Sequence, residues 1–135
     1  MDLDTARAFI RSHHRAVIAT RSATGLHQSP VLVGVDDSGR LTVSSRETAY
    51  KTKHLRADPW VQVCVFPDGF FGQWIYVEGE AEVISLPEAM EPLVEYYRGI
   101  SGEPEDWDDY RAGMERERRV LLQITPTHAG PDKQG

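Results

Sequence analysis

The sequence has little cysteine, little basic charge and no long apolar run. Cys64 is the only cysteine among 135 residues, so no disulfide can form within the chain and a reducing compartment is expected. Acidic residues outnumber basic ones by 21 to 15, which argues against partners that need a basic surface, such as nucleic acid or an anionic membrane. The first four residues show no signal peptide, and no apolar run could span a membrane. A cytoplasmic protein is predicted.

The sequence also lacks the motifs of several common enzyme classes. It contains no glycine-rich loop of the dinucleotide-binding or P-loop type and no Gly-x-Ser-x-Gly elbow for acyl transfer. The five histidines, at positions 13, 14, 27, 54 and 128, do not have the spacing of zinc ligands, so no metal site is predicted. These absences leave no catalytic acid, base or nucleophile that the sequence identifies.

What is present is a series of six β-rich segments, joined mostly by turns. They cover residues 16–20, 28–35, 41–44, 61–66, 75–83 and 120–125. Helices are expected over 2–12, 48–57 and 106–117, and a further helix begins at a capping box, Ser85 to Glu88. Six strands that each have one apolar face bury themselves best by closing into a small antiparallel barrel. The sequence therefore predicts a mainly β (α+β) domain over residues 1–127 with peripheral helices, followed by a polar tail, 128–135.

The segment 75–83 has the clearest alternation of apolar and polar residues. Its acidic residues are expected on a solvated face of the sheet. On the opposite face Gly79 and Ala81 are small, which indicates that a helix or a ligand packs closely there.

The strongest candidate for a binding site lies at the junction of the third strand and the next helix. Ser44, Ser45 and Arg46 end the strand, and the N–H groups at a helix start are free to bind an anion. Lys51 near that start opposes the helix dipole, a cost that a bound phosphate would offset. The alternative is a solvated helix face that carries Arg46, Lys51, Lys53 and Arg56. The residue pattern alone leaves both interpretations open.

Four pieces of the sequence, in this order and spacing, resemble the flavin/deazaflavin oxidoreductase superfamily, the split-barrel group that includes pyridoxamine 5′-phosphate oxidase. The pieces are 16–20 (AVIAT), 28–31 (QSPV), 51–59 (KTKHLRADP) and 77–83 (VEGEAEV). The branch that uses the deazaflavin coenzyme F420 typically shows Lys-x-x-Asn-Leu-x-x-Asp-Pro. Lys51, Leu55, Asp58 and Pro59 match this pattern, and His54 stands where asparagine is usual. The resemblance implies a six-stranded antiparallel split β-barrel with the FMN-binding fold of pyridoxamine 5′-phosphate oxidase.

The same resemblance implies a homodimer with two cofactor sites at its interface. Lys51 would grip the cofactor phosphate with Ser44, Ser45 and Arg46 nearby, and Gln28, Ser29 and Pro30 would run along the tricyclic ring. Lys53 and Arg56 would extend the basic groove along the glutamate tail of F420. Trp74 or Tyr76 would approach the ring from the partner subunit, although ordinary barrel packing explains an aromatic there equally well. His27 adjoins the ring segment, where it suits either proton donation to a substrate or a plain polar role.

Three functions follow from the resemblance. The first is an F420H2-dependent oxidoreductase that transfers a hydride to an unsaturated or quinone-like small molecule. The second is an FMN enzyme of the pyridoxamine 5′-phosphate oxidase type, and the third is a cofactor-binding module without catalysis. Residues 127–131 (THAGP) differ from the tryptophan, arginine and histidine segment with which true pyridoxamine phosphate oxidases end. The basic pattern at 51–56 favours F420, with FMN as the alternative. Because such a cofactor carries the hydride itself, no obligatory acid–base residue is implied.

Overall fold

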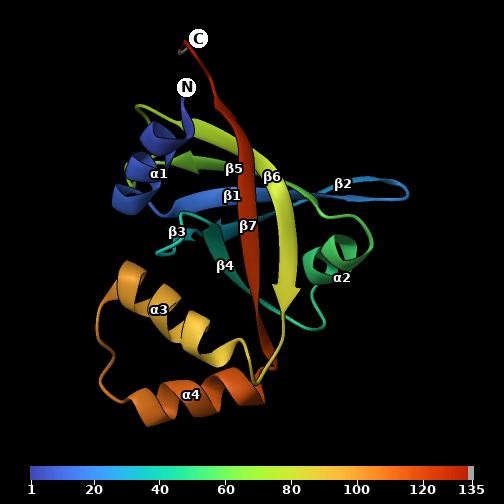
Figure 1. The fold of residues 1–135 in the computed structure, drawn as a ribbon, viewed down its shortest axis with the longest axis vertical. Coiled ribbons are helices and arrows are strands. Elements are labelled where there is room, and N and C mark those ends of the chain that lie inside the picture. Colours follow the sequence, from blue (N-terminus) through green and yellow to red (C-terminus); the bar gives the residue numbers. More distant parts are fainter. Residues whose placement is uncertain (134–135) are drawn as a thin grey trace.

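The computed structural model describes residues 1–133, which form one curled antiparallel sheet with helices around it (Figure 1). The strands are β1 (Arg15–Ser22), β2 (Gly25–Leu32), β3 (Gly34–Val35), β4 (Leu41–Arg46), β5 (Trp60–Phe66), β6 (Ile75–Ile84) and β7 (Arg119–Gly130). The helices are α1 (Leu3–Ser12), α2 (Tyr50–Ala57), α3 (Met90–Ser101) and α4 (Trp107–Arg116).

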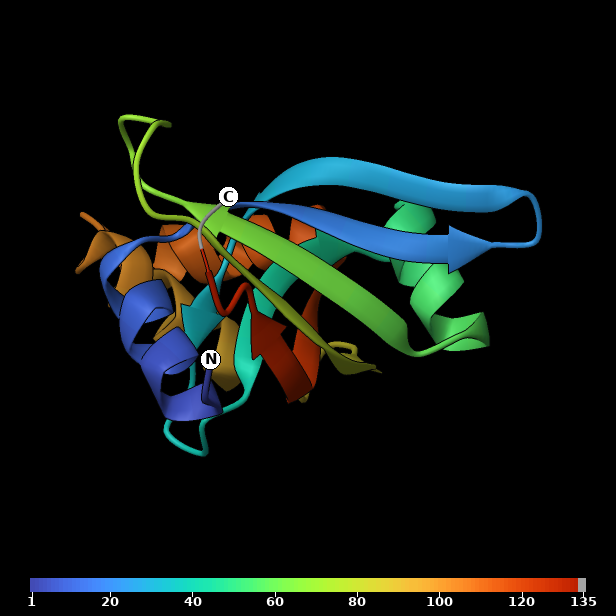
Figure 2. The ribbon, with the colours of Figure 1, turned by 90° about the horizontal axis from the view of Figure 1, so that it is seen from above.

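The sheet is curled because its two edge strands follow each other in the chain. Its strand order is β2-β1-β5-β6-β7-β4-β3, and each neighbouring pair is antiparallel. β2 and β3 lie at opposite edges, yet only Val33 separates them. The edges must therefore approach each other, which gives an open half-barrel (Figure 2). The predicted antiparallel barrel-like fold with peripheral helices is confirmed.

The predicted number of strands is wrong, because the described residues form seven strands and not six. The expected strand over 28–35 is two strands that pair with different neighbours, β2 with β1 and β3 with β4. The change of partner occurs at Val33, whose N–H donates to the carbonyl oxygen of His14 at 2.8 Å. Val33 is fully buried and lies within an apolar run, so the sequence gives no sign of the boundary between β2 and β3.

The core fills the concave side of the sheet and is closed by two helices. Ile18, Val43 and Ile75 are among its fully buried side chains. α1 inserts Ile10 at one end of the half-barrel, and α2 inserts Leu55 at the other (Figure 1). Each such side chain contributes about 1.5–3 kcal/mol when fully buried, so this core holds β4 and α2 in fixed positions.

The predicted last strand is too short at both ends. β7 runs from Arg119 to Gly130; it pairs with β4 over 119–124 on one side and with β6 over 121–130 on the other. Residues 128–130 thus belong to the sheet rather than to a polar tail, and Ala129 is buried. The end of the strand could not be predicted from the polar sequence, because Thr127 and His128 are exposed to solvent within the strand. Residues 134 and 135 of the predicted tail lie outside the described residues.

Gly79 packs against a strand, not against the helix or ligand that the sequence suggests. It lies at a bulge in the β6–β7 pairing. A Cβ atom at Gly79 would lie 2.3 Å from the backbone oxygen of Thr125, closer than any real contact. The rest of the β6 alternation is as predicted, because Ile75 and Val77 are buried while Glu80 and Glu82 are exposed.

Two further observations complete the architecture. Ser85 does not cap a helix, contrary to the prediction, because α3 begins at Met90. Its hydroxyl instead contacts the Glu47 carboxylate and accepts a hydrogen bond from Arg56 at 3.0 Å.

In the part of the chain that the structure describes, no helix combines the length and the apolar character needed to cross a bilayer.

Candidate functional site

A groove of about 800 Å³ opens between the β1–β2 side of the sheet and the helices α3 and α4. Pro30, Leu32 and Phe66 line its sheet side. Tyr96, Tyr97 and Tyr110 line its helix side, and Ser44 and Arg119 also contribute to it. We call it the β2–α3 groove. Its volume falls in the range of small-molecule and cofactor sites.

A cluster of basic side chains adjoins this groove where β4 ends and β7 begins. Arg46 and Arg119 occupy opposite positions in the β4–β7 register. Both donate to the same carboxylate oxygen of Glu117, at 2.6 and 3.0 Å respectively, and these bonds lower the pKa of Glu117. Burial, together with the charge of Arg119, lowers the pKa of Lys51. One carboxylate therefore serves as the counter-ion of two arginines, and Lys51 has no ion pair among residues 1–133.

Three buried polar atoms on β7 and β2 lack hydrogen-bond partners within the described residues. They are Nε of Arg119, Oγ of Ser29 and Nδ1 of His27. A buried donor without an acceptor costs about 1–3 kcal/mol, so a bound group that supplies an acceptor would stabilise it. The start of α2 is also open, because Ala49 at its N-cap provides no side-chain bond and its first turn has no acidic residue. The region thus has several unused donors and an excess of positive charge.

Two of the tyrosines in the groove wall, Tyr96 and Tyr110, use their hydroxyl groups as hydrogen-bond donors to the backbone. The hydroxyl of Tyr96 donates to the carbonyl oxygen of Leu32 at 2.8 Å, and that of Tyr110 donates to Leu93 at 2.9 Å. Burial raises the pKa of Tyr96, and burial with the neighbouring tyrosines raises the pKa of Tyr110 to about 12. Both phenols stay protonated at neutral pH, with their protons committed to backbone oxygens.

The structure places the predicted ring-binding residues on both faces of β2. Pro30 lines the groove, and Gln28 is exposed on the same, outward side of the strand. Ser29 points the other way, and its hydroxyl oxygen is buried. Ser44 lines the groove as well, whereas Ser45 is buried and its hydroxyl bonds to that of Thr52 at 2.8 Å.

The basic residues of α2 that were expected to line one groove, Lys51, Lys53 and Arg56, do not lie on one face of the helix. Lys53 and Arg56 are three residues apart and share a face, whereas Lys51 points roughly 140–200° away around the helix. Arg56 is bound to Glu47 at 2.9 Å, and Arg46 is held by Glu117. Lys53 is exposed, and its side chain has no ion pair within the described chain.

The aromatic residues expected from a partner subunit lie at the start of β6. Trp74 is half-buried directly before the strand and interacts with other residues of this chain. It is not among the residues that line the β2–α3 groove of its own chain over residues 1–133. Tyr76 faces outward, with its hydroxyl 3.5 Å from Nε2 of His128.

His54, which replaces the usual asparagine of the motif, has a structural role. Its Nδ1 lies 3.0 Å from Oγ1 of the buried Thr20, which ties α2 to β1. Its ring also packs 5.5 Å from that of His27. Asp58 accepts two hydrogen bonds from Arg21 and thereby anchors the end of α2 to the β1–β2 hairpin. Within residues 1–133 no three histidine, cysteine or acidic side chains gather as a metal site would require.

A curled antiparallel half-barrel with peripheral helices is the split-barrel fold of the pyridoxamine 5′-phosphate oxidase type. The sequence model of one such family, described as pyridoxamine 5′-phosphate oxidase, matches residues 3–130. The chain belongs to the pyridoxamine 5′-phosphate oxidase family of flavin-binding oxidoreductases.

Solved structures share this fold at low sequence identity. A conserved hypothetical protein from Mycobacterium tuberculosis has a TM-score of 0.74 at 22% identity, over 96% of this chain and 82% of that one. A protein described as an F420 reductase has a TM-score of 0.71 at 16% identity, over 92% and 94%. An FAD-binding protein from Mesorhizobium loti has a TM-score of 0.63 at 16% identity, over 96% and 92%. These identities establish the shared fold alone.

Proposed function

We propose that this protein is an F420H2-dependent oxidoreductase that reduces an unsaturated or quinone-like small molecule, with FMN as the alternative cofactor. The observation that carries the proposal is the cluster of Arg46 and Arg119, which share the carboxylate of Glu117, with Lys51 close enough for the charge of Arg119 to lower its pKa. On a chain with a formal charge of −6, such local positive charge favours a bound anion.

The residues present fit the phosphate of a flavin-type cofactor. Lys51 and the guanidinium of Arg119 would hold the phosphate, because charge-assisted bonds to phosphate oxygens would use the buried Nε that has no acceptor. The uncapped N–H groups at the start of α2 would add further donors. Ser44, which lines the groove beside them, would complete this phosphate site.

The β2–α3 groove would hold the ring system. Pro30 and Leu32 offer one apolar wall, and Tyr96 and Tyr97 offer an aromatic wall that excludes water. When bound, the reduced deazaflavin would supply the hydride that the substrate accepts. The protein's part is to orient the two reactants, since the hydroxyls of Tyr96 and Tyr110 are already bonded to backbone oxygens.

A second copy of the chain would cover the outward face of β2, β1 and β5. Pro30, Val17 and Cys64 lie in register across these strands, and Tyr76 continues the row on β6. Leu26 and Leu32 are 64% and 44% exposed on the same face of β2. An apolar row of this kind is typical of a protein interface, and a homodimer would place the partner beside each groove.

The choice of F420 over FMN rests on Lys53 and Arg56. F420 carries a phosphodiester and several glutamates, and this tail would pass around α2 from Lys51 to the face that carries Lys53 and Arg56, where Lys53 has no ion pair within the described chain. Similar solved structures include both an F420 reductase and an FAD-binding protein, so the shared fold is compatible with a deazaflavin and with a flavin.

The proposal is tested by fluorescence titration with F420 and with FMN at low and high salt. We expect tighter binding of F420 and a steeper loss of its affinity with salt, because exposed charges are screened over about 8 Å at physiological ionic strength. The Lys53→Glu variant should weaken F420 binding and leave FMN binding nearly unchanged. Lys53 suits this test better than Arg56, whose substitution would also break the bond to Glu47.

A matched control is Lys133→Glu, which changes the charge equally at an exposed position beyond β7. It should leave the affinity for F420 nearly unaltered. Tighter binding of FMN than of F420 at both salt concentrations, with turnover that depends on oxygen, would replace the proposal with the flavin-oxidase alternative.

A further inference from the structure

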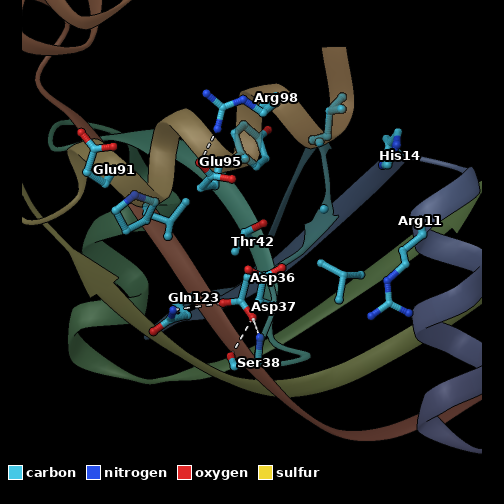
Figure 3. A pocket seen from close by; sticks show the side chains of 17 residues that line it. Arg11, His14, Asp36, Asp37, Ser38, Thr42, Glu91, Glu95, Arg98 and Gln123 are labelled. Atoms are coloured by element: carbon cyan, nitrogen blue, oxygen red, sulfur yellow. Dashed lines mark hydrogen bonds and ion pairs between the residues drawn. The ribbon is translucent and has the colours of Figure 1, made fainter. Parts of the chain in front are cut away.

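A second cavity, of about 720 Å³, lies between α1, α3, the β3–β4 hairpin and β7 (Figure 3). It shares one wall residue, Tyr96, with the β2–α3 groove. No residue of the proposed phosphate site lines it, since Ser44, Lys51 and Arg119 are absent from its described walls. The cavity is large enough for a ligand of its own.

The side chains around the cavity divide into an apolar surface and a set of charged groups. Val35, Pro92, Ile100 and Leu121 provide the apolar surface. Figure 3 shows Arg11 and His14 on the α1 side, across from the helix α3 that carries Glu91, Glu95 and Arg98. The hairpin with Asp36 and Asp37 lies between them. A ligand would therefore meet apolar and charged groups together.

Four of the six acidic and arginine side chains already have partners in the protein. Arg98 pairs with Glu95, and Glu91 pairs with Arg111 at 2.5 Å. Asp36 accepts hydrogen bonds from the backbone N–H groups of Ser38 and Arg40, at 2.9 and 3.0 Å. These four groups therefore have partners within the protein without a ligand.

The other two charged groups, Arg11 and Asp37, have opposite signs. Both are exposed, and over residues 1–133 neither side chain makes an ion pair or a hydrogen bond. His14 adds an acceptor, because its Nδ1 donates to the carbonyl oxygen of Val33 at 2.9 Å and this leaves Nε2 with a free lone pair. The cavity thus offers one cation and one anion beside an apolar surface.

From this pattern we infer that the cavity binds a small zwitterion with an apolar body, of the amino acid or short peptide type. Its carboxylate pairs with Arg11, its ammonium group pairs with Asp37, and its side chains pack on Val35, Pro92 and Ile100. A ligand with a single charge would satisfy one of the two groups and leave the other without a partner. This site is separate from the proposed cofactor site and does not depend on it.

The test is isothermal titration of the protein with the dipeptide leucyl-phenylalanine and with two blocked forms. The N-acetyl form lacks the ammonium group, and the C-terminal amide lacks the carboxylate. We expect the free dipeptide to bind about tenfold more tightly than either blocked form, or more, because each loses one charge-assisted bond.

Two exposed substitutions identify the groups involved. Arg11→Gln should remove the preference over the amide and keep the preference over the N-acetyl form, and Asp37→Asn should do the reverse. Lys133→Gln is the control and should change neither preference. Equal binding of the three peptides, no binding at millimolar concentration, or unchanged preferences in both variants would overturn the inference.

Discussion

Lys51 and Arg119 are neighbouring positive charges, and within residues 1–133 Arg119 shares the carboxylate of Glu117 with Arg46 while Lys51 has no ion pair. We expect Lys51→Met to weaken cofactor binding about ten- to a hundredfold, the effect of losing one charge-assisted phosphate contact of about 1.5–3 kcal/mol. The free energy of unfolding of the cofactor-free protein should stay equal or rise, because burial and Arg119 both disfavour the charged lysine.

The measurement is a cofactor titration paired with denaturant unfolding. Lys53→Met is the control in the titration with FMN, which has no glutamate tail for Lys53 to contact; it removes an exposed lysine from the same helix and should alter neither FMN binding nor stability by much. If Lys51→Met lowered stability and left cofactor affinity intact, Lys51 would be a structural residue and the phosphate assignment would fail.

Asp36 stabilises the β3–β4 hairpin in its ionised form. Burial opposes ionisation, but hydrogen bonds from Ser38, Arg40 and Gln123 outweigh it and lower the pKa below 3.8. A lowered pKa in the folded state gives stability that is present above pH 3.8 and is lost as the pH falls through the folded-state value. We expect Asp36→Asn to destabilise the protein by about 1–2 kcal/mol at neutral pH.

That difference should shrink as the pH falls below 3.8, since the native aspartate then becomes protonated. Urea unfolding of both proteins between pH 7 and the lowest pH at which they stay folded gives the comparison. A difference that stays constant across this range would mean that the side-chain charge has no part in it.

Single residues show which part of the site could be predicted from sequence. Lys51, Ser44 and Pro30 lie in contiguous motifs, and all three are in or beside the groove region. Arg119 and Tyr96 were not predicted, because Arg119 reaches the site only through the β4–β7 pairing and Tyr96 through the packing of α3. Residues brought together by tertiary structure leave no local spacing in the sequence.

At the scale of elements, the β6–β7 bulge depends on the absence of a side chain at Gly79. We expect Gly79→Ala to destabilise the protein by about 1–3 kcal/mol, because the new Cβ would push against the Thr125 backbone and strands cannot yield as a flexible side chain can. Gly99→Ala, in α3, is the matched control. It meets nothing within 4 Å and should stabilise the helix by about 0.5–1 kcal/mol.

Thermal unfolding of both variants gives the comparison. Equal and small effects of the two substitutions would contradict the prediction. They would mean that β6 and β7 can move apart at the bulge without loss of stability, despite the close approach of Gly79 to Thr125.

The elements with a regular period were predicted well, and those that change partner were not. The alternation in β6 identified both its faces, because Ile75 and Val77 are buried while Glu80 and Glu82 are exposed. The β2–β3 segment exchanges β1 for β4 at Val33, and the pairing of β7 with β6 continues past the end of β4, through the bulge, to Gly130. A switch of hydrogen-bond partners hardly alters the apolar pattern, so its position has to come from the structure.

For the whole molecule, the proposed homodimer predicts about twice the chain mass of 15.2 kDa by light scattering at micromolar concentration. Val17→Glu should shift the mass toward one chain, because it places a charge in the middle of the apolar row between Pro30 and Cys64. Thr127→Glu, on an exposed position of β7, should leave the dimer intact. A wild-type monomer that still binds cofactor would rule out a site that needs the partner.

The β4–β7 pairing also affects the rates of folding and unfolding. Arg46 and Arg119 are paired although more than seventy residues separate them, so a large loop must close before they meet. Contacts of such long range make folding slow, because the loop-closure entropy is lost before they form. We expect a ligand held by these residues to bind only after they are in place, and so to leave the folding rate nearly unchanged. Cofactor binding would then lengthen the lifetime of the folded protein by slowing its unfolding.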